Sequence, residues 1–186
     1  MKEFTSDWVT SKIPLWEKHV LPLLPQSGPV RWLEIGSYEG RSACWAAEVL
    51  ASRPGSELHC VDIWFSKAHE GRFDRNTDDI PFLFKHKRDS ASWMTEAGSR
   101  GDKFDVIYVD GDHEAKAVIT DAILAWRLLK PGGVMVFDDY PWKHYDNRPD
   151  WDGIPPKPAI DAFLEFWKKD LQLLAKEWQV YVRKIR

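Results

Sequence analysis

The sequence predicts an α/β fold, in which a mostly parallel sheet carries helices on both faces and an antiparallel hairpin at its carboxyl end. Strand-like apolar runs alternate with helix-like segments between residues 30 and 140, an order typical of parallel sheets. The clearest unit is residues 105–140, where a strand, an amphipathic helix and a second strand follow one another. Such a unit makes its strands parallel and places the helix across one face. A chain of 186 residues is long enough for one such domain and too short for two.

Seven strands are expected from runs of β-branched and aromatic residues, at 30–35, 57–63, 81–86, 105–109, 134–137, 171–175 and 178–182. The expected helices have an apolar face at helical spacing and lie at 41–51, 91–97, 114–130 and 159–169. Residues 7–24 are expected to form short helices broken by prolines. The polar residues 64–80 are expected to be a loop with a short helix near Gly71–Thr77, and Pro131-Gly132-Gly133 is expected to end the helix before it.

Composition limits the classes of function. The net charge is -3 and the basic residues are scattered, which argues against a nucleic-acid-binding surface, although a structured RNA is not excluded outright. The two cysteines, Cys44 and Cys60, lie in apolar segments, so we expect buried free thiols in a reducing compartment. The sequence has no run that resembles a signal peptide or reaches membrane-spanning length. We therefore expect a cytoplasmic, soluble protein that does not bind membranes.

Acidic residues follow two strands of the predicted unit. Asp110 follows the strand at 105–109, and Asp138-Asp139 follow the strand at 134–137. If these strands are neighbours about 4.8 Å apart, the three carboxylates meet at the carboxyl edge, where open α/β sheets bind ligands. A hard divalent cation would relieve their mutual repulsion. The alternative is that some of them cap helices or face water, and for Asp112, just before a helix, capping is favoured.

A glycine-containing loop follows the first strand. Leu33-Glu34-Ile35-Gly36-Ser37-Tyr38-Glu39-Gly40 has Gly-x-x-x-Gly spacing, which matches neither a dinucleotide fingerprint nor a phosphate-binding Walker loop. The acid Glu34 would repel a pyrophosphate but suits a ligand with an ammonium or sulfonium group. Asp62 ends the second strand, where a carboxylate can accept both hydroxyls of a ribose; a surface turn is at least as common a role for a single aspartate.

Four segments together resemble the class I S-adenosylmethionine-dependent methyltransferases: LEIGSYEG, CVDIW, VDGDH and LLKPGGVMVFDDY. The resemblance is nearest to the metal-dependent O-methyltransferases of macrolide sugars and more distant to the catechol and caffeoyl-CoA enzymes. It covers residues 30–140 well and implies a single Rossmann-like domain. The third strand departs from the pattern, since KHKRDS lacks the glycine that relatives place before the acid. The extra amino-terminal region of the macrolide enzymes is also missing, so their substrate cannot be carried over.

The resemblance implies a cofactor site for S-adenosylmethionine. The methionine part would be lined by Glu34, Gly36, Ser37 and Gly40, the ribose would be held by Asp62, and the adenine would lie beside Asp89 and Ser90. We also assign Tyr38, Ile63 and Asp110 to the cofactor site. The implied metal ligands, for Mg²⁺ or a similar ion, are Asp110, Asp138 and Asp139, and the implied general base is His113.

The chemistry of methyl transfer agrees with this assignment. Attack on a sulfonium needs an oxygen held in line and relieved of its proton. A divalent ion would lower the pKa of that hydroxyl, and a histidine accepts a proton near neutral pH. The alternative for His113 is a residue that merely caps or packs at the start of a helix.

The resemblance divides the single domain of residues 1–186 into four parts: an amino-terminal helical cap at 1–29, a cofactor- and metal-binding core at 30–140, a substrate loop at 141–158, and a closing helix with hairpin at 159–186. Trp8, Trp64, Trp142 and Trp151 could line an apolar cleft. We expect a small acceptor with a sugar-like or ring-bearing hydroxyl, and a homo-oligomer is possible. Two other functions stay open: a metal-dependent nucleotide-sugar glycosyltransferase, suggested by Asp110-Gly111-Asp112, and a non-catalytic cofactor-binding partner module.

Overall fold

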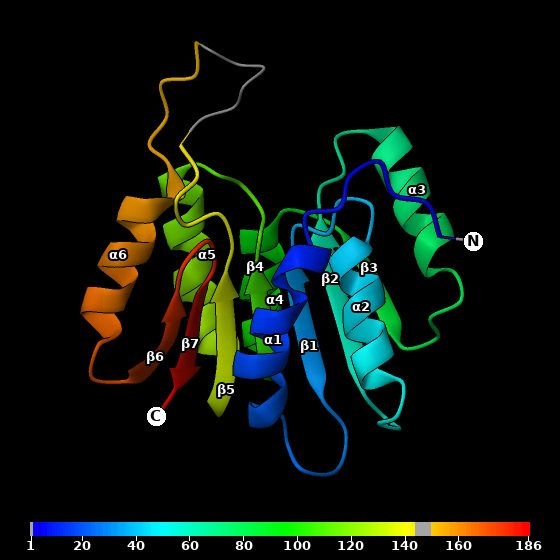
Figure 1. Ribbon diagram of the computed structural model, residues 1–186, viewed down its shortest axis with the longest axis horizontal. Coiled ribbons are helices and arrows are strands. Elements are labelled where there is room, and N and C mark those ends of the chain that lie inside the picture. The colour runs from blue at the N-terminus through cyan, green and yellow to red at the C-terminus, as the bar shows by residue number, and fades with distance from the viewer. Residues whose placement is uncertain (1, 144–149) are drawn as a thin grey trace.

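The computed structural model describes residues 2–143 and 150–186 and is built on a seven-stranded sheet of order β3-β2-β1-β4-β5-β7-β6 (Figure 1). The strands are β1 (Arg31–Ile35), β2 (Glu57–Asp62), β3 (Leu83–Lys87), β4 (Phe104–Val109), β5 (Leu129–Phe137), β6 (Leu171–Lys176) and β7 (Val180–Lys184). The pairs among β1 to β5 are parallel, and β7 is antiparallel to both β5 and β6. The predicted α/β architecture with a closing hairpin is confirmed.

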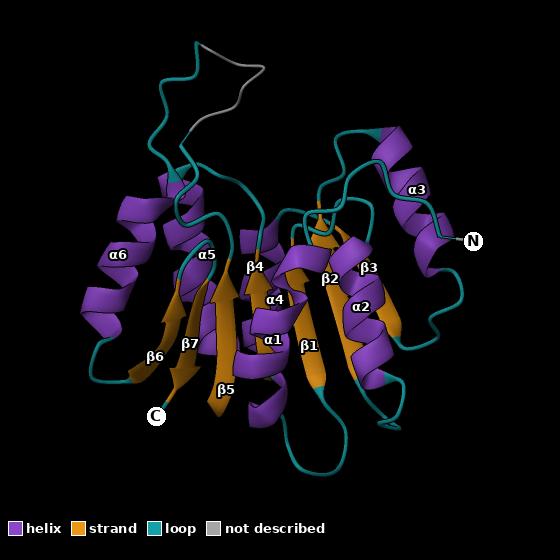
Figure 2. Ribbon diagram, in the orientation of Figure 1, coloured by secondary structure: helices purple, strands orange, loops and turns teal. Residues whose placement is uncertain are grey.

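Helices cover both faces of the sheet (Figure 2). One face carries α1 (Ile13–His19) and α2 (Arg41–Leu50), and the other carries α4 (Ser90–Arg100), α5 (Ala115–Leu128) and α6 (Pro156–Trp167). α3 (Lys67–Thr77) lies beyond the carboxyl end of β2, and two short 3-10 helices, Thr10–Lys12 and Leu21–Leu23, flank α1. Successive side chains of a strand point to opposite faces, so β1 supplies Trp32 to one core and Leu33 with Ile35 to the other.

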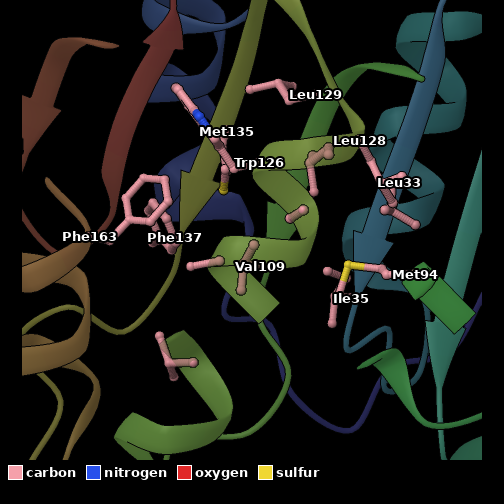
Figure 3. Close-up of a cluster of buried hydrophobic side chains, with 14 of the residues drawn as sticks. Leu33, Ile35, Met94, Val109, Trp126, Leu128, Leu129, Met135, Phe137 and Phe163 are labelled. Carbon is pink, nitrogen blue, oxygen red and sulfur yellow. The ribbon is translucent and has the colours of Figure 1, made fainter. Parts of the chain in front are cut away.

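Aromatic rings pack between the helices and the sheet. On the α5–α6 face, the Phe163 ring centroid lies 5.4 Å from Trp126 and 5.2 Å from Phe137 (Figure 3). On the opposite face, Trp16 of α1 stacks on Trp32 of β1 at 5.6 Å. Full burial of a phenylalanine such as Phe163 or Phe137 stabilises the fold by about 1.5–3 kcal/mol. The two cores therefore fix the strand ends, and with them the polar edge of the sheet.

The end of α5 differs from the expectation. The helix stops at Leu128, and Pro131-Gly132-Gly133 lies inside β5 and does not terminate the helix. Leu129 pairs with Phe104 of β4, and the register shifts before Val106 pairs with Val134. A Cβ on Gly133 would lie 2.8 Å from the Asp105 carbonyl oxygen, so the close approach of two strands requires glycine there.

The segment 64–80 is also more ordered than its composition indicates. Ser66 begins α3 by accepting a hydrogen bond from the His69 amide, and the helix runs for 11 residues to Thr77. It is anchored by Phe73, whose ring lies 4.7 Å from that of Trp64. Trp64 is therefore a core residue, only 4% exposed, and does not line an open cleft.

Candidate active site at the carboxyl edge of the sheet

The glycine bend after β1 lies between the carboxyl ends of β2 and β4. The Gly36 amide donates to the Val61 carbonyl at 2.9 Å, and the Asp110 amide donates to the Ile35 carbonyl at 2.8 Å. Gly36 has φ +83°, and a Cβ there would lie 1.9 Å from the Asp110 carbonyl oxygen. Only glycine fits this position, because the conformation is left-handed and the backbone of β4 occupies the space of a side chain. The bend therefore lies directly beside the first residue of the acidic edge.

Glu34 is a buried acid with an orphaned oxygen. Its Oε1 accepts a hydrogen bond from Ser42 at 3.0 Å, whereas its Oε2 has no hydrogen-bond partner. Burial raises the pKa of Glu34 to about 7, against the opposing effect of the Ser42 hydrogen bond. The residue faces a cavity of ≈ 10 Å³, about the space of one water molecule, lined by Val9, Lys12, Trp16, Trp32, Glu34, Ser42, Trp45, Tyr108 and Gln179. An orphaned carboxylate oxygen in such a place suits an ammonium donor.

Asp62 braces the glycine loop. Its Oδ2 accepts from the amides of Ser37 and Tyr38 at 2.9 Å each, and its Oδ1 accepts from the Trp64 amide at 2.7 Å. These bonds hold Tyr38 at φ +47° and Trp64 at φ +41°, conformations that are unfavourable for non-glycine residues. The next residue, Ile63, is 40% exposed at the edge. Asp62 is thus placed where sequence reasoning expected a ligand-binding acid, and it also organises the loop.

Asp89 and Ser90 begin α4. Asp89 caps the helix by accepting from the Ser92 amide at 2.8 Å, and Ser90 Oγ donates to Asp121 Oδ1 at 2.7 Å. Asp121 lies buried in α5, and burial raises its pKa to about 6. The two residues assigned to the adenine therefore contact helix partners, one of which, Asp121, was not among the predicted residues.

The ends of β4 and β5 bring acids together with a histidine. One ligand atom each from Asp110, His113 and Asp139 lies within 4.8 Å of the others. His113 Nε2 and Asp139 Oδ2 are 2.6 Å apart, and the Trp178 indole donates to Asp139 Oδ1 at 3.0 Å. Asp139 has φ +55°, so the chain turns sharply to place this carboxylate. Asp112 lies outside the group, and its carboxylate accepts from the Glu114 amide at 3.0 Å. The N-cap of α5 is Glu114, whose side chain accepts from the Lys116 amide, so the capping role favoured for Asp112 is wrong.

Asp138 has a different environment from its neighbours. Both of its oxygens accept from the Lys12 ammonium at 2.7 Å, and Oδ2 also accepts from the Gln179 amide at 2.8 Å and from the Tyr108 hydroxyl. Its side chain is 2% exposed. Metal ligation by Asp138 stays a prediction, and in the structure its oxygens accept from these protein donors.

Tyr108 links two of the acids. Its hydroxyl lies 2.8 Å from Asp110 Oδ2 and is also bonded to Asp138. A phenol has one proton, so it cannot donate to two ionised carboxylates at once. Burial raises the pKa of Asp110 well above its usual range, and the charges of Asp138 and Asp139 add to this. Tyr108 therefore links the two carboxylates through a single hydroxyl.

Three of these contacts involve residues that sequence reasoning did not select. Tyr108 precedes Asp110 by two positions in an extended run, a spacing that places both on one face and could have identified it. Lys12 and Gln179 lie 126 and 41 residues from Asp138, and no local pattern connects them. Residues from near both ends of the chain therefore contact Asp138 in the site.

Aromatic side chains flank the edge. The Trp142 ring lies 4.8 Å from His113 and 5.2 Å from Trp151, and Trp8 packs against Tyr38 at 5.4 Å. Residues 144–149 of the predicted substrate loop lie outside the described residues. Within the part that is described, indoles stand beside both the acidic group and the glycine loop.

A family model described as a methyltransferase domain matches residues 33–140, which include the glycine bend, Asp62 and all the acids of the edge. The chain belongs to this methyltransferase family. The resemblance to class I S-adenosylmethionine-dependent methyltransferases is thereby confirmed. Among the described residues, the methyltransferase has no helix that is both long and apolar enough to cross a membrane.

Solved structures share the fold of this methyltransferase. The O-methyltransferase TomG from Streptomyces achromogenes matches with a TM-score of 0.63 and 18% identity, over 84% of this chain and 73% of its own. MycE, from the mycinamycin pathway and bound to Mg and SAH, matches with a TM-score of 0.68 and 16% identity, over 97% of this chain and 51% of its own. A Clostridium thermocellum protein with the provisional name of rRNA methylase matches with a TM-score of 0.67 and 13% identity, over 98% of this chain and 100% of its own.

One curated protein sequence is also similar. An uncharacterized protein, R132, of Acanthamoeba polyphaga mimivirus is 26% identical over 117 residues, which are 59% of this chain and 51% of the relative. The methyltransferase chain therefore spans about half the length of the curated relative that it matches.

Proposed function

We propose that this methyltransferase transfers a methyl group from S-adenosylmethionine to a hydroxyl oxygen of a small molecule, with the help of Mg²⁺ or a similar divalent cation. The observation that carries the proposal is the position of the acidic group. Asp110, His113 and Asp139 converge within 4.8 Å, and the Asp110 backbone touches the glycine bend. A cofactor held along that bend would present its methyl group to an oxygen held at the acids.

Residues at the carboxyl ends of β1 and β2 and at the start of α4 would form the cofactor site. The orphaned oxygen of Glu34 would accept from the methionine ammonium, and the bend from Gly36 to Gly40 would lie along the methionine part. Asp62 and Ile63 would contact the ribose and the face of the base, with Asp89 and Ser90 beyond them at the start of α4. This arrangement follows the β1–β2–β3 edge in the order expected for a nucleoside ligand of an open α/β sheet.

The acids would hold the cation, and His113 would take the proton. Asp110, Asp138 and Asp139 offer the oxygen ligands that Mg²⁺ prefers, and their crowding is itself relieved by positive charge. When bound, the cation would lower the pKa of the acceptor hydroxyl. Asp139 fixes the orientation of the His113 imidazole through the 2.6 Å contact, which suits a histidine that receives a proton from an oxygen held nearby.

Ligand binding and methyl-transfer assays together distinguish this activity from the alternative functions. Thermal shift is measured with S-adenosylhomocysteine and, separately, with a nucleoside diphosphate plus Mn²⁺; we expect stabilisation by the first alone. Radiolabelled methyl transfer is then screened against phenols, sugars and RNA, with and without a chelator. Transfer to small hydroxyl compounds that stops on chelation supports the proposal. Stabilisation by the nucleotide would favour a glycosyltransferase, transfer to RNA would change the acceptor class, and full activity without metal would remove the cation from the mechanism.

A further inference from the structure

Residues 2–12 form a strap across the carboxyl edge of the sheet, between α3 and α1 (Figure 1). Thr5 donates to the Glu39 carboxylate from its amide at 2.7 Å and from its hydroxyl at 2.8 Å. Farther along, Trp8 packs on Tyr38, and Arg41 donates to Thr10 Oγ1 at 2.6 Å. The strap therefore packs against the glycine loop and the start of α2 through Thr5, Trp8 and Thr10.

The strap ends at Lys12, whose ammonium group contacts a carboxylate at the acidic edge. Lys12 Nζ lies 2.7 Å from both oxygens of Asp138, and the two side chains are only 15% and 2% exposed. Asp138 is bonded through Tyr108 to Asp110, and its Oδ1 accepts from the Asp139 amide at 2.7 Å. The ammonium is thus the positive partner of a buried carboxylate that is linked to Asp110 through Tyr108 and to Asp139 through its amide.

We propose that Lys12 is a built-in cation of this site, which competes with a divalent cation for Asp138, so that binding of the ion releases the strap from the glycine loop. This inference rests on the proposed function in assuming that the acidic group binds a divalent ion with Asp138 among its ligands. An ammonium and a divalent ion cannot both hold the same two carboxylate oxygens, because they repel each other and need the same lone pairs. Lys12 and Val9 also line the cavity that Glu34 faces, so displacement of Lys12 would uncover the cofactor side of the site.

Direct binding of Mn²⁺ to the full chain tests the competition. Its dissociation constant is measured by electron paramagnetic resonance for the unaltered protein, for Lys12→Met and Lys12→Gln, and for the matched control Lys18→Met, an exposed lysine of α1. We expect both Lys12 variants to bind Mn²⁺ at least about tenfold more tightly and Lys18→Met to bind it unchanged. Two Lys12 variants are used so that a folding defect in one leaves the other informative.

Hydrogen exchange of the strap supplies a second measurement that does not depend on activity. Mn²⁺ should speed amide exchange in residues 3–12 of the unaltered protein, whereas in the Lys12 variants exchange should be fast with or without the ion. Equal Mn²⁺ affinity in all four proteins, or slower strap exchange on adding Mn²⁺, would overturn the role of Lys12 and leave the proposed function standing. Absence of Mn²⁺ binding in every protein, with S-adenosylhomocysteine still bound, would overturn both this inference and the cation in the proposed function.

Discussion

The Gln179 amide nitrogen lies 2.8 Å from Asp138 Oδ2, which ties the closing hairpin to the acidic edge. The same side chain accepts from the Trp16 indole at 2.9 Å and from the Tyr181 hydroxyl through Oε1. It is 1% exposed. One buried amide therefore connects α1, the end of β5 and β7, and it holds a carboxylate of the candidate active site in place.

Gln179→Ala should lower the free energy of unfolding by roughly 2–5 kcal/mol, because several buried polar groups lose their partner at once. Gln172, exposed on β6, is the matched control, and Gln172→Ala should change stability by about 0.5 kcal/mol or less. Urea denaturation of both variants gives the comparison. Similar losses for the two variants would mean that the Gln179 network contributes little.

Gly36→Ala should prevent folding or cost several kcal/mol, since the new Cβ would lie 1.9 Å from the Asp110 carbonyl oxygen. Gly28 separates the strain of backbone conformation from this steric clash. It has φ +84° but no heavy atom within 4 Å of the corresponding Cβ, so Gly28→Ala should cost only about 1–2 kcal/mol. Expression yield and urea midpoints measure both effects. A mild effect at Gly36 would show that the bend can open away from β4.

Glu34→Gln should stabilise the protein at alkaline pH and weaken its binding of S-adenosylhomocysteine. The pKa of Glu34 is raised from 4.5 to about 7, so the folded state retains a proton that the unfolded state releases. Stability from this group is complete below about pH 4.5 and is lost as pH rises towards 7, a change of about 3 kcal/mol at 1.36 kcal/mol per unit. Urea denaturation at pH 5.5 and 8, with and without the substitution, checks the slope. An unchanged slope in the variant would locate the pH dependence elsewhere.

Substitutions at Asp62 and Asp138 should have opposite effects. Asp62→Ala removes the acceptor of the Ser37 and Tyr38 amides, so affinity for S-adenosylhomocysteine should fall at least about tenfold. Asp138→Ala should abolish methyl transfer while cofactor affinity stays within about twofold, and a chelator should have the same effect on the unaltered protein. Isothermal titration and the transfer assay measure the two quantities. Loss of cofactor affinity in Asp138→Ala would contradict this division of roles.

The sequence alone determined that acidic residues would meet at the carboxyl edge of the sheet. Apolar runs at strand spacing, an amphipathic helix between two of them and acids at their ends are local patterns, and parallel pairing brings Asp110 and Asp139 to one side of the sheet. The glycine bend was visible for the same reason, since Gly36 directly follows an apolar strand. These features depend on neighbouring residues, whose periodicity reports which face is buried.

The tertiary structure decided the partners of those residues. α3 is a polar segment that becomes a long helix because Phe73 packs on Trp64, and α5 stops at Leu128 because Leu129 pairs with Phe104. Lys12 reaches Asp138 across 126 residues, and Gln179 reaches it across 41. Such contacts depend on how helices and hairpins dock on the sheet, and burial then selects the donor that satisfies each carboxylate. No local periodicity in the sequence indicates which donor will pair with each carboxylate, so these partners are seen only in the folded structure.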